Sequence, residues 1–225
     1  MPETSMDSTS QHQDLSMGTQ SIPLDFAIHT MEHLGYLCVG DQEPSAEDAA
    51  KVDRVFEGSP KLSAPWFDFC KGGDESKSFL MSDHEWFRKI IKNRLNVHDF
   101  RDLKKQGPAI IEFKENTEVE QFMRAHPSRE AVSVFRPLRD SAGWDNGLFK
   151  LFTSSHHQND HEFEHSPDKD ADEVVVDKKQ CLFVDGALYV KLSPKGGVRM
   201  VWQGFSKRPM FGDIDNPKGL PFMKI

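Results

Sequence analysis

The fold is decided by residues 178–205, which read KKQCLFVDGALYVKLSPKGGVRMVWQGF. Three short runs rich in Val, Leu, Phe and Tyr alternate here with an Asp-Gly pair and a Gly-Gly pair. Short apolar runs separated by turn residues predict successive β-strands. The same pattern occurs upstream in AVSVFRPL (131–138), GLFKLFT (147–153) and EVVVD (173–177). The second half of the chain therefore predicts an antiparallel β-sandwich or barrel.

The first half of the chain predicts helices. Apolar residues recur at helical spacing in LDFAIHTMEHL (24–34), SAEDAAKVDRVFEG (45–58) and HEWFRKIIKNRL (84–95). In the second of these segments, Ser45 and Asp48 have the spacing of a capping box, with Asp in place of the usual Glu. Two further runs, YLCV (36–39) and AIIEF (109–113), predict strands because they are short and apolar.

Three segments between these elements have other patterns. Residues 59–78 contain two prolines and a Gly-Gly pair, which predict a loop. Residues 117–124 predict a short helix capped by Thr117. Residues 154–172 are polar, acidic and rich in histidine, and predict a surface insertion.

These elements predict one α+β domain, with N-terminal helices packed on an antiparallel β-sandwich formed mainly by residues 132–205. A chain of 225 residues is long enough for one substantial core. We expect this domain to span residues 22–205, with the polar insertion at about 154–172. Residues 1–21 are rich in Ser, Thr, Gln and Asp and predict a disordered tail, and residues 206–225 predict a C-terminal extension.

Composition excludes several classes of protein. The net charge of -8 opposes attraction to phosphate backbones, so we expect no nucleic-acid partner. No apolar stretch approaches the roughly 20 residues that span a bilayer, so we expect no membrane partner. The three cysteines, Cys38, Cys70 and Cys181, are odd in number and far apart, which predicts reduced thiols and a cytoplasmic protein.

Two segments together resemble the phytanoyl-CoA dioxygenase branch of the iron(II) and 2-oxoglutarate-dependent oxygenases. Residues 131–157 are similar to that family's strand, Asn-Gly turn and second strand closing in Ser-His, and residues 178–205 to its strand, Asp-Gly, strand, Gly-rich turn and Arg-bearing last strand. A third segment, HLGYLCVGDQEPSAEDAAKV (33–52), resembles its opening strand and Ala-rich helix. The resemblance implies a double-stranded β-helix of the cupin-like or jelly-roll type, here an incomplete one.

The departures from the family pattern concern its metal site. Non-heme iron oxygenases hold iron with two histidines and one carboxylate. The single His-x-Asp tripeptide of this chain, His12-Gln13-Asp14, lies in the predicted tail, and the distal histidine would fall at about Val190. Arg199 matches the family's 2-oxoglutarate-binding arginine. The resemblance therefore implies a scaffold that has lost its iron centre, and we expect no metal and no cofactor.

One local motif has the form of a zinc site. Residues 161–165, HEFEH, match the H-x-x-E-H arrangement of inverted zinc peptidases. Their polar context is typical of a mobile acidic loop, because a catalytic zinc site needs a rigid helix to hold its ligands. His157, His161 and His165 are therefore candidates for a weak zinc or nickel site alone.

The main functional hypothesis is a degenerate oxygenase-like protein that keeps a ligand-sized cavity inside its β-helix. Such a protein would bind a small apolar metabolite, and would act as a metal-free isomerase or cyclase or as an accessory protein in specialised-metabolite biosynthesis. The resemblance and the residue types make four residues candidates for this cavity: Arg199, Arg136, Asp185 and Tyr189.

Two alternatives stay open from the sequence, and with them the question of whether the chain is an enzyme. The first is an active iron(II) and 2-oxoglutarate dioxygenase that recruits His126 or His156 as a ligand. The second is a non-enzymatic interaction protein that contacts a protein partner through the acidic, histidine-rich loop.

Overall fold

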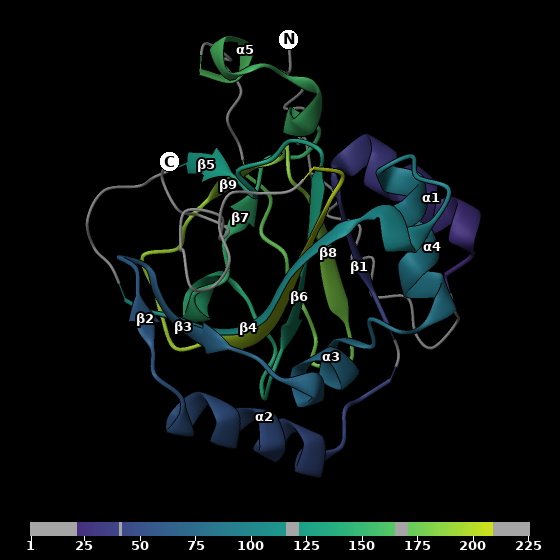
Figure 1. Cartoon of the computed structure of the whole chain (residues 1–225). Helices are drawn as coiled ribbons and strands as arrows, with labels where there is room; N and C mark the ends of the chain where they lie inside the picture. The colour runs from purple at the N-terminus through teal and green to yellow at the C-terminus, as the bar shows by residue number, and fades with distance from the viewer. Residues whose placement is uncertain (1–21, 41, 116–121, 165–170, 209–225) are drawn as a thin grey trace, which may run out of the picture.

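The chain has an α+β fold with five helices and two antiparallel sheets in the part that the computed structural model describes, residues 22–40, 42–115, 122–164 and 171–208 (Figure 1). The helices are α1 (Leu24–Leu34), α2 (Ala46–Gly58), α3 (Asp74–Leu80), α4 (Glu85–Arg94) and α5 (Asp160–Glu164). The strands are β1 (Tyr36–Val39), β2 (Leu62–Ser63), β3 (Phe67–Lys71), β4 (Lys104–Phe113), β5 (Phe122–Arg124), β6 (Ala131–Pro137), β7 (Lys150–Leu151), β8 (Cys181–Asp185), β9 (Tyr189–Lys191) and β10 (Arg199–Ser206). Within these ranges, every helix is too short or too polar to cross a membrane.

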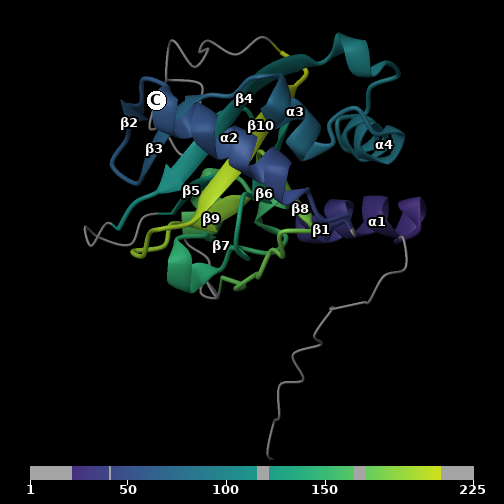
Figure 2. The same cartoon turned by 90° about the horizontal axis from the view of Figure 1, so that it is seen from below.

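The two sheets form the framework of the fold. The larger sheet has the strand order β1-β8-β6-β10-β4-β3-β2, and the smaller sheet has the order β5-β9-β7. All neighbouring strands are antiparallel. Figure 2 shows α3 and α4 on one side of the larger sheet and the smaller sheet on the other. This arrangement confirms the predicted helices on an antiparallel β-sandwich.

The larger sheet has a separate apolar core on each face. Along β10, Met200 and Trp202 face the smaller sheet, whereas Val201 and Phe205 pack among the helices. Successive side chains of a strand point to opposite faces, so Arg199 lies on the helical face with Val201. This alternation decides which residues can reach the interior between the sheets.

Several predicted elements are confirmed at their predicted places. Helix α2 begins after Ser45, whose hydroxyl accepts a hydrogen bond from the Asp48 backbone N–H at 3.0 Å and donates one to the Asp48 carboxylate at 2.7 Å. Helix α4 is also confirmed, as are the strands β1, β6, β8, β9 and β10. Strand β10 ends at Ser206, one residue beyond the predicted end of the domain.

The predicted loop over residues 59–78 is wrong. The segment contains β2, β3 and the start of α3, and β3 pairs with β4 along its whole length. Phe67 and Phe69 are buried in the core between the sheets, which is the alternation expected of a strand. The prolines and the glycine pair flank this strand at positions 60, 65, 72 and 73, so they mark its boundaries.

Two other predicted elements also differ from the structure. EVVVD (173–177) forms an isolated bridge between Val176 and Ala142 in place of a strand. The helix predicted over residues 117–124 is wrong at its end, because residues 122–124 form β5 and pair with β9. The remainder of that predicted helix, residues 117–121, lies outside the described residues.

The histidine-rich insertion is partly built into the fold. His156 is buried, and Phe163 of α5 packs against Phe152 and Tyr189. Residues 165–170 of the insertion lie outside the described residues, as do the predicted tail, 1–21, and residues 209–225 of the predicted extension.

Candidate functional site

The interior between the two sheets is filled by apolar side chains. Phe135, Val190 and Trp202 have no solvent-accessible surface, and Phe149 is 1% exposed. A void that could hold one water molecule would give these side chains accessible surface. No void of that size therefore adjoins these four side chains, and they do not line the cavity that we expect inside the β-helix.

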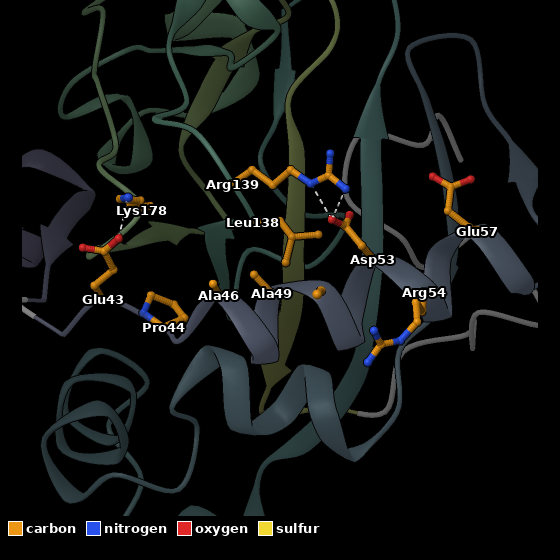
Figure 3. A pocket seen from close by; sticks show the side chains of 11 residues that line it. Glu43, Pro44, Ala46, Ala49, Asp53, Arg54, Glu57, Leu138, Arg139 and Lys178 are labelled. Atoms are coloured by element: carbon orange, nitrogen blue, oxygen red, sulfur yellow. Dashed lines mark hydrogen bonds and ion pairs between the residues drawn. The ribbon is translucent and has the colours of Figure 1, made fainter.

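A hollow of about 600 Å³ lies instead beside helix α2, outside the β-helix. We call it the α2 trough; its apolar floor consists of Pro44, Ala46, Ala49, Ala50 and Leu138. Figure 3 shows an ion pair at each end of this floor, Glu43 with Lys178 and Asp53 with Arg139. Its volume is within the range of small-molecule sites, and an apolar floor with a few charged groups is typical of them.

The Asp53 end of the α2 trough is built from three elements distant in sequence. Asp53 of α2 is 6% exposed, and its carboxylate accepts hydrogen bonds from Arg139, after β6, and from Nη1 of Arg199, on β10, at 2.7 Å. Nη2 of Arg199 lies 2.7 Å from Glu112 and 2.9 Å from Glu57, and its hydrogen bond lowers the pKa of Glu57. Buried charges need such partners, so this network fixes the end of the trough.

The four predicted ligand residues do not meet at one cavity. Arg199 belongs to the Asp53 network. Arg136 is buried and donates to the backbone carbonyls of Phe79, at 2.7 Å, and Gln42. Asp185 is buried and pairs with Arg94 of α4. Tyr189 stacks on Phe163 with ring centroids 3.7 Å apart, and its hydroxyl donates to Asp160.

The weak zinc candidates are not assembled either. His157 is exposed, with Nε2 3.0 Å from the carbonyl oxygen of Glu32. His161 lies on the exposed side of the five-residue helix α5, and His165 is outside the described residues. Whether this segment contacts a protein partner stays a prediction.

No family model matches the sequence, and no curated protein is significantly similar to it. Solved structures, however, match most of the chain. SnoN, a non-heme alpha-ketoglutarate-dependent epimerase from nogalamycin biosynthesis, superposes with a TM-score of 0.63 at 14% identity, over 89% of this chain and 93% of SnoN. The fold is that of the non-heme alpha-ketoglutarate-dependent enzymes.

Two further structures agree with this fold. HygX from Streptomyces hygroscopicus, solved with nickel, 2-oxoglutarate and hygromycin B, has a TM-score of 0.62 at 11% identity, over 85% of this chain and 89% of HygX. AviO1 from Streptomyces viridochromogenes has a TM-score of 0.60 at 13% identity, over 87% of this chain and all of AviO1. The fold implied by the family resemblance is thus confirmed.

The described residues do not fit the iron centre that such a fold suggests. Val190, to which the family resemblance assigns the distal histidine, lies opposite Met123 in the β5–β9 ladder, and neither side chain offers a ligand of the facial triad. Among the described residues, no three His, Cys, Asp or Glu side chains are grouped to hold a metal ion. Arg199, which the family resemblance matches to the 2-oxoglutarate-binding arginine, is held by carboxylates on the helical face.

The two histidines of the alternative hypothesis are engaged within the fold. His126 accepts the Ser128 backbone N–H on Nδ1 at 3.1 Å, and its Nε2 lies 2.8 Å from Oε1 of Gln106. Nε2 of His156 lies 2.9 Å from the Glu32 carbonyl oxygen, and a Cβ on Gly35 would lie only 2.5 Å from its Nδ1. Neither ring has a nitrogen directed at open space for a metal.

Sequence reasoning missed the α2 trough, although one signal pointed to it. Ala46, Ala49 and Asp53 are spaced three and four residues apart, so they share one face of α2. Small side chains along one face of a helix leave space for a ligand beside that face, and this pattern can be recognised from the sequence. The partners of Asp53, Arg139 and Arg199, are 86 and 146 residues away, and nothing in the local pattern connects them.

Proposed function

We propose that this chain is a small-molecule-binding protein that uses the α2 trough, and not the interior of its β-helix, to hold a small and mainly apolar metabolite. The observation that carries the proposal is the contrast between a filled interior and a trough of about 600 Å³ with an apolar floor. In this role the chain serves specialised-metabolite biosynthesis as an accessory protein or a metal-free isomerase or cyclase. Two proteins of similar fold, the epimerase SnoN and the carbocyclase SnoK, are from nogalamycin biosynthesis, which supports this setting.

The chemistry open to this site is binding and orientation. The apolar floor excludes water from one side of a ligand, and the ion pairs at the two ends fix where a polar group can lie. Among the described residues, no three His, Cys, Asp or Glu side chains are grouped to hold a metal ion.

Filling the trough should weaken binding. Ala46 is an exposed position of α2 that lines the trough, so Ala46→Phe places a ring on its floor without disturbing the core. We expect the variant to bind 1-octanol, a neutral apolar probe, about tenfold more weakly than the parent in calorimetric titration, because the ring takes the probe's place.

Glu47→Phe is the matched control for this experiment. It adds the same ring to the same helix, at a side chain that is 77% exposed and does not line the trough. Equal binding by the parent and Ala46→Phe would refute the trough as the binding site.

Metal content separates this proposal from the oxygenase alternative. After anaerobic incubation with iron(II) and 2-oxoglutarate, we expect far less than one iron per chain by elemental analysis and no heat of 2-oxoglutarate binding. The physical reason is that, among the described residues, no three His, Cys, Asp or Glu side chains are grouped to hold the metal. Near-stoichiometric iron together with 2-oxoglutarate binding would contradict the proposal.

A further inference from the structure

The Asp53–Arg139 ion pair separates the α2 trough from a second hollow of about 310 Å³. Both residues line both hollows, and the second is completed by Glu112, Asn146, Val198 and Arg199 among others. A ligand group at this end of the trough must therefore contact Asp53 and Arg139 directly.

The two arginines that pair with Asp53 are held very differently. The Arg199 side chain is 15% exposed, is paired with three carboxylates and lies over the ring of Phe56, at 4.1 Å from the ring centroid. The Arg139 side chain is 68% exposed, and Asp53 is its single ion-pair partner among the described residues. Because the Arg139 side chain is exposed, it can turn into water once another cation takes its place beside the buried carboxylate of Asp53.

Removal of Arg139 would leave Asp53 with room for another cation. One carboxylate oxygen of Asp53 stays bound to Arg199, whereas the oxygen that accepts from Arg139 would face the trough. A buried carboxylate favours a charged donor in such a position. Arg139 thus holds a place that the ammonium group of a ligand can take.

The charge around this end also favours a cation. Four carboxylates, Asp53, Glu57, Glu112 and Asp140, line the two hollows here, against the guanidinium groups of Arg139 and Arg199. Arg54 of α2 also lines the trough, but its side chain points away from the Asp53–Arg139 pair in Figure 3. An anion in the same place would lie among carboxylates and be repelled.

The length of the floor sets the size of the apolar part. Ala46 and Asp53 are seven residues apart on α2, which at 1.5 Å per residue gives a floor of about 10 Å. Leu138 faces this floor from the opposite side, as Figure 3 shows. A short alkyl chain or a system of two or three fused rings has this length.

We propose that the α2 trough selects amphipathic amines, with the ammonium group replacing Arg139 at Asp53 and the apolar body lying along Ala46, Ala49 and Leu138. This inference rests on the proposed function, namely that the trough binds a small molecule. The inference adds that the ligand carries a positive charge. It also makes Arg139 a gate, in the sense that Arg139 and the ligand compete for the carboxylate of Asp53.

The test is a calorimetric titration of the full chain at pH 7 with octylamine, 1-octanol and octanoate, which share one chain length. We expect octylamine to bind about tenfold more tightly than 1-octanol, since a charge-assisted hydrogen bond is added, and octanoate to bind most weakly. If no probe binds, the proposed function itself fails. If octanol equals octylamine, or octanoate binds most tightly, the trough is a binding site and the inference about amines is overturned.

Variants of the ion pair test the mechanism. Arg139→Ala removes the competitor from an exposed position, so we expect octylamine to bind at least about threefold more tightly, with 1-octanol unchanged. Asp53→Asn should remove the preference for the amine; because Asp53 also holds Arg199, its folding must be checked by circular dichroism. Arg101→Ala, at a surface pair that is 89% exposed on the arginine, is the control and should change nothing. Weaker or unchanged octylamine binding by Arg139→Ala would refute the gate.

Discussion

The protein should lose stability as the pH falls from 6.5 to 4, and this loss should begin well above the pH at which most carboxylates are half protonated. Burial lowers the pKa of His126 to about 4, and burial next to His157, Arg94 and His33 does the same for His156. A histidine whose pKa is depressed in the fold takes up its proton in the unfolded state first. Stability is therefore present above pH 6.5 and is lost as the pH falls to 4, by about 3 kcal/mol for His126 and up to a similar amount for His156.

The hydrogen bonds of His126 give the structural reason. Nδ1 of the neutral ring accepts the Ser128 backbone N–H, so Nε2 carries the proton and donates to Gln106. A second proton on Nδ1 would place two N–H groups against each other in a buried site. Protonation must then break the bond to Ser128 or open the site.

Urea unfolding at pH 7, 6, 5 and 4 measures this loss. His126→Gln cannot be protonated, so its stability should fall over the same range by about 3 kcal/mol less than that of the parent. His98→Gln, at an exposed histidine, is the matched control and should follow the parent. A parent protein equally stable at pH 7 and pH 4 would show that these two rings are not held neutral by burial.

The sequence predicts the elements whose patterns are local. β8, β9 and β10 are short apolar runs bounded by Asp-Gly and Gly-Gly, and α2 is preceded by Ser45 as its cap. Strand β3 was hidden because its two phenylalanines stand between prolines and a glycine pair, which are strong turn signals. Strand β5 has three residues, and its identity depends on pairing with β9, which no local pattern encodes.

The candidate site could be predicted in part only, for a related reason. The family resemblance placed Arg199 correctly on the last strand. It could not show which face of the sheet Arg199 lies on, because a shift of one residue in strand pairing turns every side chain to the opposite face. Met200 and Trp202 take the inward positions, and Arg199 is therefore turned toward α2 and Asp53. Register and distant ion pairs are decided by the assembled sheet, so the trough became visible in the structure alone.

Arg94→Met should destabilise the protein by about 3 kcal/mol at pH 7, because it leaves the carboxylate of Asp185 buried without a cation. Asp185 is 1% exposed, and its carboxylate also accepts a hydrogen bond from the backbone N–H of Ala187, at 2.7 Å. Methionine keeps an apolar stem at position 94, so the change is mainly one of charge. The pair joins α4 to β8, and its loss should weaken the packing of the helical layer on the sheet.

The pH dependence of this variant distinguishes a buried charge from lost packing. Burial already raises the pKa of Asp185, with Arg94 acting to lower it, so removal of Arg94 should raise that pKa further. A carboxyl whose pKa is raised in the fold takes up its proton there first, and stability is regained as the pH falls through that pKa. The deficit of Arg94→Met relative to the parent should thus shrink on acidification, and adding Asp185→Asn should recover much of it at pH 7.

Lys89→Met is the matched control, since Lys89 lies on the same helix and pairs with Glu85 at the surface, where both side chains are largely exposed. We expect it to change the free energy of unfolding by less than about 0.5 kcal/mol in urea titration. Equal losses for Arg94→Met and Lys89→Met would refute a dependence of the fold on the buried pair. A deficit of Arg94→Met that stays constant from pH 7 to pH 4 would instead assign the loss to packing, because a buried carboxylate cannot stay charged and uncompensated over that range.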